Sequence, residues 1–133
     1  MSFSWPIRVY YEDTDAGGVV YHSNYLNFFE RARSEWLAAM NVSQTQLLEQ
    51  DVVFVVRSAN LDFIKAARFE QKLVVDSVVS KLGKASIIFT QELKDLEGTL
   101  YCQGEVKVGC VQLSTMKPTA IPQHIHLEFK RAS

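Results

Sequence analysis

Hydrophobic residues recur along this chain first at the helical period and then at the strand period. Between about Ser23 and Met40 they return every three or four residues, with polar side chains on the opposite side. This spacing predicts an amphipathic helix roughly 27 Å long. Ser23 or Asn24 can cap its first turn, and Asn41 is typical of a helix end. The hydrophobic stripe consists of Tyr25, Phe28, Phe29, Ala32, Trp36 and Leu37.

Shorter elements flank this helix. Alternating residues at 7–12 predict a strand with Pro6 at its start, where a missing N–H does least harm. After the helix, Ser43 and Gln46 fit a capping box, which predicts a short helix over about 45–50.

From residue 52 almost to the end, β-branched and aromatic residues are typical of strands. Gly83-Lys84 and Glu97-Gly98 are predicted turns, and strands joined by such short connections run antiparallel. The predicted strands span 52–64, 73–82, 85–96 and 99–113, and a closing helix is expected at 122–130.

The order of these elements predicts an α+β fold. A long helix with a hydrophobic stripe must cover that stripe, and only the sheet offers a large hydrophobic surface. We therefore expect one domain over residues 1–133, with an antiparallel sheet wrapped around a long central helix. Because such a sheet has edges, we also expect the chain to form oligomers.

Composition narrows the classes of function. A net charge of −1 gives no electrostatic drive toward nucleic acids or anionic membranes. The N-terminus lacks a signal peptide, and no run approaches the roughly 20 hydrophobic residues that span a bilayer. Cys102 and Cys110 lie too far apart along one predicted strand for a disulfide, so they are expected as buried free thiols. A cytoplasmic protein is expected.

Five motifs are similar to those of a known family. They are Tyr10–His22 (YYEDTDAGGVVYH), Asn24-Tyr25, Phe29–Arg33, Val53–Arg57 and Met116–Pro118. Together they resemble the hotdog-fold acyl-CoA thioesterases of the 4-hydroxybenzoyl-CoA type, and in particular the YbgC branch. The resemblance covers nearly the whole chain.

The resemblance implies a hotdog domain that forms a homodimer or homotetramer, with active sites at the subunit interface. It implies that Asp15, in the DxxG turn, attacks the thioester or activates water. It also implies that a backbone N–H near His22, at the start of the central helix, polarises the thioester carbonyl. The substrate-binding residues are predicted to be Gly17, Gly18, Val19, Tyr21 and Tyr25.

This assignment makes chemical sense, because thioester hydrolysis needs a nucleophile or base and donors for the developing oxyanion. Taken alone, Asp15 would more often be a turn residue, and Gly17 and Gly18 more often a simple turn. The DxxG spacing selects Asp15 over Asp13, for which a structural role is expected. Glu12 is expected to be solvated.

Several roles stay open. His22 can act through its side chain or only through its backbone, and Tyr25 belongs equally to the hydrophobic stripe. Glu30 matches the helix glutamate that a second hotdog group uses as its base. Its spacing from Arg33 instead favours a surface ion pair. No metal site or cofactor is predicted, since His124 and His126 have no ligand constellation around them.

The predicted function is hydrolysis of an acyl-CoA to the free acid and coenzyme A, with acyl carrier protein thioesters as further substrates. The YbgC branch also suggests a link to the Tol–Pal envelope system. The rivals are a hotdog dehydratase and a non-catalytic protein that binds acyl-CoA or an acyl carrier protein. Candidate ligands of the coenzyme A phosphates are Arg57, Lys65, Arg68 and Lys117.

Overall fold

The structure, a computed structural model, describes residues 2–132, so the outermost residues of the predicted domain lie outside it. The sheet strands are ordered β1-β3-β4-β5-β2, β6 pairs with β5, and every pairing is antiparallel. The strands are β1 (Phe3–Arg8), β2 (Val52–Phe63), β3 (Lys72–Leu82), β4 (Ser86–Asp95), β5 (Leu100–Gln112) and β6 (Lys117–Pro118). The helices are α1 (Asn24–Ala39), α2 (Gln44–Glu49) and α3 (Gln123–Ala132), with a 3₁₀ turn at Tyr11–Asp13.

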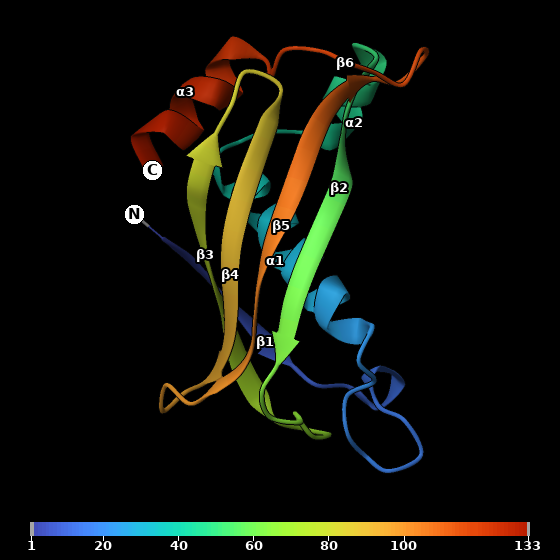
Figure 1. Ribbon diagram of the computed structural model, residues 1–133, viewed down its shortest axis with the longest axis vertical. Coiled ribbons are helices and arrows are strands. Elements are labelled where there is room, and N and C mark those ends of the chain that lie inside the picture. Colours follow the sequence, from blue (N-terminus) through green and yellow to red (C-terminus); the bar gives the residue numbers. More distant parts are fainter. Residues whose placement is uncertain (1, 133) are drawn as a thin grey trace.

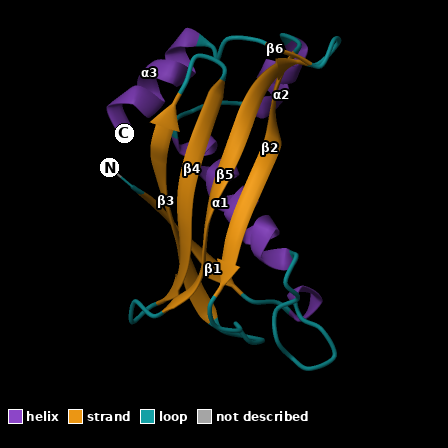
Figure 2. Ribbon diagram, viewed as in Figure 1, coloured by secondary structure: helices purple, strands orange, loops and turns teal. Residues whose placement is uncertain are grey.

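The sheet curls around α1, which runs along one of its faces (Figure 1). Helix α3 covers the end of the sheet near β3, and α2 lies beside β2 (Figure 2). Register shifts occur between Val56 and Ser58 in β2 and between Val79 and Lys81 in β3. Such bulges bend a strand and increase its twist. The predicted α+β fold, with an antiparallel sheet around a central helix, is confirmed.

The hydrophobic stripe of α1 forms the core against this sheet. Its N-terminal half packs with β1, β3 and β5, and includes Phe28 and Phe29, both fully buried. At the other end, Trp36, Phe89 and Phe129 pack edge to face, with ring centroids 5.5 to 5.9 Å apart. These three rings join α1, β4 and α3, so the closing helix completes the core rather than lying free.

The predictions for α1 and for the long strands are confirmed to within two residues at each end. Asn41 ends the first helix with a positive φ of 61°. The prediction that Ser23 or Asn24 caps α1 is wrong for Ser23, whose side chain makes no capping bond. By contrast, the Ser43 side chain accepts from the Gln46 N–H at the start of α2, as predicted.

The first strand begins earlier than predicted. It spans Phe3–Arg8, and residues 11–13 form a 3₁₀ turn instead. Pro6 therefore lies inside the strand, opposite Val74 of β3. This is tolerated because β1 is an edge strand, where a missing N–H breaks no ladder on the open side.

Cys102 and Cys110 are free and buried, as expected, and both lie on β5. Within residues 2–132, no helix is long and hydrophobic enough to cross a membrane.

Candidate active site

Asp15 opens a tight turn ahead of α1. The Gly18 N–H donates to the Asp15 carbonyl at 3.0 Å, and the Asp15 N–H donates to the Val19 carbonyl at 2.9 Å. Gly18 adopts a φ of 77°, a conformation that favours glycine. One carboxylate oxygen of Asp15 accepts from the Gly17 N–H at 2.8 Å. The carboxylate itself is exposed to solvent.

This turn is fastened to the segment that follows β2. Val20 donates its N–H to the Ala67 carbonyl at 2.8 Å, and Phe69 donates to Gly18 at 3.2 Å. Val19 also forms an isolated bridge with Arg68. Because Ala67 is fully buried in the core, the turn is held at a fixed place relative to the sheet.

Asp13 anchors the same turn from inside. It is only 2% exposed. Its carboxylate accepts from the Tyr10 N–H at 2.8 Å and from the side-chain amide of Asn24. Asp13 therefore ties the turn to the first residue of α1, which is the structural role expected for it. Asn24 was expected only as a cap, and its bond to Asp13 was missed.

His22 lies between the turn and the helix. Its ring packs against Tyr21 at 4.4 Å and meets the Phe63 ring edge-on at 6.3 Å. Its backbone N–H donates to no other group in residues 2–132. Both His22 and Tyr21 are exposed. A free amide just ahead of α1 lies where the helix dipole favours negative charge.

Tyr25 is a core residue, as its place in the hydrophobic stripe of α1 allowed, and only 4% of it is exposed. Its hydroxyl oxygen accepts from the Ala67 N–H at 3.1 Å. Burial raises the pKa of this phenol, so it stays protonated. Phe63 contacts both Tyr25 and His22 while remaining 54% exposed. The sequence contains no indication of a role for Phe63, because the pattern there shows only that a strand ends.

The predicted ion pair between Glu30 and Arg33 is absent among the described residues. Arg33 is buried, at 9% exposed, and donates to the Gln91 side chain at 2.9 Å. Glu30 stays exposed on α1, beyond the turn that carries Asp15. The helical period predicted that Arg33 lies next to the polar, solvent-facing side of α1. In the structure the sheet curls far enough to cover it.

The basic candidates for coenzyme A are separated by the fold. Lys65 and Arg68 line one hollow together with Phe69 and Tyr101, next to the Asp15 turn. Arg57 packs over Gly109 in the middle of the sheet, and Lys117 lies in β6.

For metals, residues 2–132 contain no group of three or more side chains that could hold an ion.

Comparison with known proteins identifies the family. The model of the thioesterase-like superfamily matches residues 9–129. An acyl-CoA thioesterase YbgC of Haemophilus influenzae is 49% identical over 129 residues, which is 96% of this chain and 93% of that protein. An acyl-CoA thioester hydrolase YbgC of Escherichia coli O6:H1 is 45% identical, over 97% of this chain and 96% of that protein.

Solved structures agree in fold. A probable thioesterase from Bartonella henselae superposes with a TM-score of 0.85 at 32% identity, covering 92% of this chain and all of that one. A 1,4-dihydroxy-2-naphthoyl-CoA thioesterase from Synechocystis gives a TM-score of 0.91 at 23% identity, covering 98% and 96% of the two chains. The resemblance predicted from the sequence is thus confirmed: this chain belongs to the thioesterase-like superfamily and has its hotdog fold.

Proposed function

We propose that this protein hydrolyses acyl-CoA thioesters to the free acid and coenzyme A. The observation that carries the proposal is the exposed Asp15 carboxylate, held on a fixed turn ahead of the free backbone N–H of His22 and the start of α1. The YbgC relatives, which carry the names of acyl-CoA thioesterases and thioester hydrolases, support it.

Two routes fit an aspartate at this place. In one, an Asp15 oxygen attacks the carbonyl carbon and the thiolate of coenzyme A leaves, which gives a mixed anhydride that water then hydrolyses. In the other, Asp15 takes a proton from water as the water attacks. Both routes consume one water and release one thiol. A single turnover in heavy-oxygen water separates them, because only the anhydride route places the label in Asp15.

The oxyanion that develops on the carbonyl needs donors that are already in place. The His22 N–H is unpaired within the described chain and lies at the positive end of α1. A backbone role is therefore sufficient for His22. The loop of Gly17, which is exposed, and of Gly18 and Val19, which are half-buried, lies with the exposed Tyr21 where substrate would contact it.

We assign the phosphates of coenzyme A to Lys65 and Arg68. Arg68 bridges to Val19 directly, and the Lys65 ammonium lies 5.3 Å from the centre of the Tyr101 ring. Both side chains are exposed and cationic, as phosphate recognition requires.

We also propose that two copies pair through β2 and that active sites lie near their interface. β2 is a sheet edge, and its residues 56–60 are exposed. It carries Val56 at 52% and Phe63 at 54% exposure. A long open edge with hydrophobic side chains invites another strand. The opposite edge, β1, is short and contains Pro6. A measurement of the mass in solution distinguishes a dimer from a tetramer.

We expect this enzyme to act in the cytoplasm, because a reducing compartment keeps cysteines such as its two buried ones as free thiols. Thioesters of an acyl carrier protein are a second substrate class. A role beside the Tol–Pal system rests on the YbgC resemblance alone.

The test is release of free thiol from an acyl-CoA panel running from propionyl to palmitoyl and including benzoyl. Thiol release supports hydrolysis. Tight binding with no thiol released, even at high protein concentration, would instead identify a binding protein. Conversion of the acyl chain with the thioester intact would identify a dehydratase.

A further inference from the structure

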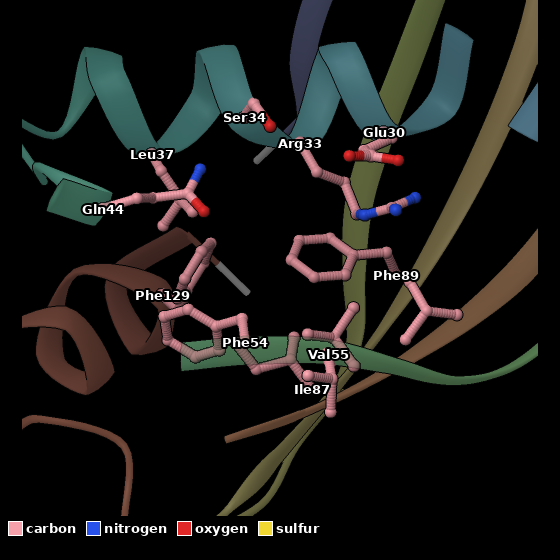
Figure 3. Close-up of a pocket in the computed structure, with 12 residues that line it drawn as sticks. Glu30, Arg33, Ser34, Leu37, Gln44, Phe54, Val55, Ile87, Phe89 and Phe129 are labelled. Carbon is pink, nitrogen blue, oxygen red and sulfur yellow. The ribbon is translucent and has the colours of Figure 1, made fainter. Parts of the chain in front are cut away.

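A cavity of about 340 Å³ lies between α1 and the sheet, beside the β2 edge. Its walls are largely hydrophobic and include Phe54, Ile87, Phe89 and Phe129. Figure 3 shows these side chains below the helix, with Arg33 reaching down from α1 toward them. The cavity thus combines hydrophobic walls with one buried cation.

Arg33 is held in place but only partly satisfied. Its guanidinium donates once, to Gln91, and no carboxylate in residues 2–132 comes within ion-pair distance of it. Gln91 in turn donates to the Phe29 carbonyl at 3.0 Å and to the Ser77 hydroxyl at 2.9 Å. Gln91 and Ser77 are both fully buried. A fixed network therefore orients the guanidinium, whose remaining N–H groups donate to no acceptor within residues 2–132.

Such a group favours an anionic partner. Burial lowers the pKa of Arg33, because the charged form loses water. A buried charge is stabilised by an opposite charge with good hydrogen-bond geometry. The planar fork of a guanidinium matches a carboxylate, which it binds through two parallel bonds.

The cavity is within reach of the thioester site. Gln91 holds the Arg33 guanidinium at the level of Phe29, five residues along α1 from Asn24. At the usual rise per residue this is ~7.5 Å from the start of the helix. An extended chain advances ~1.25 Å per carbon–carbon bond, so four or five such bonds span ~5 to 6 Å, and a hydrogen bond of ~2.9 Å to the guanidinium covers the rest. Acyl groups of this length, bound by their carbonyl ahead of α1, would place a terminal group beside Arg33.

We infer that this cavity receives the acyl group and that Arg33 selects acyl chains that end in a carboxylate, such as glutaryl and adipyl. The inference rests on the proposed thioesterase function and names its substrate class. Arg33 acts here as a specificity residue, since it contacts the far end of the substrate and no reacting atom.

Glu30 is the opposing charge at this cavity. It lines the same space, and its negative charge favours the charged form of Arg33. It is exposed, however, so solvent screens it more than it screens the buried guanidinium. Removing its charge should therefore improve binding of an anionic acyl group.

The test compares kcat/KM for glutaryl-CoA with pentanoyl-CoA, and for adipyl-CoA with hexanoyl-CoA, after subtraction of spontaneous hydrolysis. The wild type is expected to prefer the dicarboxylic member of each pair. Arg33→Met should lower the glutaryl to pentanoyl ratio by about 10- to 100-fold, the range for a hydrogen bond to a charged group. Glu30→Gln should raise the ratio. Arg31→Met, an exposed arginine on the same helix, should leave it unchanged.

Both substrates are measured on one sample, so a loss of folded protein cancels in the ratio. If Arg33→Met does not fold, the inference is tested by the preference of the wild type for the dicarboxylic substrates and by the change in the ratio that Glu30→Gln causes. A wild type that prefers the neutral acyl chains, or a ratio that Arg33→Met leaves unchanged, overturns the inference while leaving the thioesterase function intact. Release of no thiol from either member of the pairs, or from the wider panel, overturns both.

Discussion

Two aspartates in one turn, two residues apart, have opposite surroundings. Asp13 is buried and accepts from the Tyr10 backbone and the Asn24 amide, so its lone pairs are committed to structure. Asp15 is exposed, and only one of its oxygens accepts a hydrogen bond, from the Gly17 N–H. The second oxygen of Asp15 faces no donor in residues 2–132, which leaves it available to a substrate or a water.

The cysteines give a residue-scale prediction. Burial raises the pKa of the Cys102 thiol to about 12, from an ordinary value of 9.0. Alkylation needs the thiolate, which at pH 8 is then roughly one molecule in ten thousand. We expect iodoacetamide to leave Cys102 unmodified in the native protein and to modify it in urea, as read by mass spectrometry. Rapid labelling of the native protein would contradict its burial.

The same shift has a defined sign for stability. The unfolded thiol loses its proton before the folded one does, so the unfolded state binds fewer protons at high pH. The contribution of Cys102 to stability is therefore complete below about pH 9 and is lost as the pH rises toward 12. Urea midpoints of a Cys102→Ala variant should fall less over this range than those of the wild type.

At the scale of elements, the turn at residues 15–18 links the first strand to the central helix. Gly18 and Gly98 both have positive φ, at 77° and 92°, and a Cβ at either would meet nothing within 4 Å. A residue with a Cβ would thus destabilise either position only through backbone strain, by roughly 1 to 2 kcal/mol.

These two glycines form a matched pair. Gly18→Ala and Gly98→Ala should lower the free energy of unfolding by similar amounts, as measured in urea. Only Gly18→Ala should also lower the rate of thioester hydrolysis, because it moves the turn that holds Asp15. Equal rates of thioester hydrolysis in both variants would show that the geometry of this turn does not matter for the reaction.

Elements were predictable where the signal is local. The period of Tyr25, Phe28 and Phe29 fixed α1, and the DxxG turn drew attention to Asp15. The signal fails where a contact is distant in sequence. The sheet buries Arg33, and the acceptor of its hydrogen bond, Gln91, lies 58 residues away in the sequence. Likewise the partner of β2 is β5 rather than β3, which no local pattern indicates.

At the scale of the whole molecule, the two sheet edges differ. β1 is six residues long and interrupted by Pro6, whereas β2 is twelve residues long and has no neighbour on its outer side within the described chain. Natural proteins protect such edges with charges, prolines or a partner. The proposed pairing of two copies through β2 would cover this longer edge.

A lysine on β2 tests this interface. Val56→Lys places a charge on the open edge, so the proposed dimer should dissociate to species of the 15.1 kDa chain, as measured by light scattering after gel filtration. Leu96→Lys, at a position 74% exposed in the β4–β5 turn, should leave the mass unchanged. A wild type that is already monomeric would contradict pairing through β2.

The measurement that most directly tests the central claim is hydrolysis of acyl-CoA by Asp15→Asn beside Glu12→Gln. Both changes remove one exposed carboxylate from the same short stretch and nearly keep its shape. If Asp15 is the nucleophile or base, Asp15→Asn should lose on the order of 10² to 10⁴ in kcat, and Glu12→Gln should keep the wild-type rate. Equal rates for Asp15→Asn and wild type would contradict the account and direct attention to Glu30.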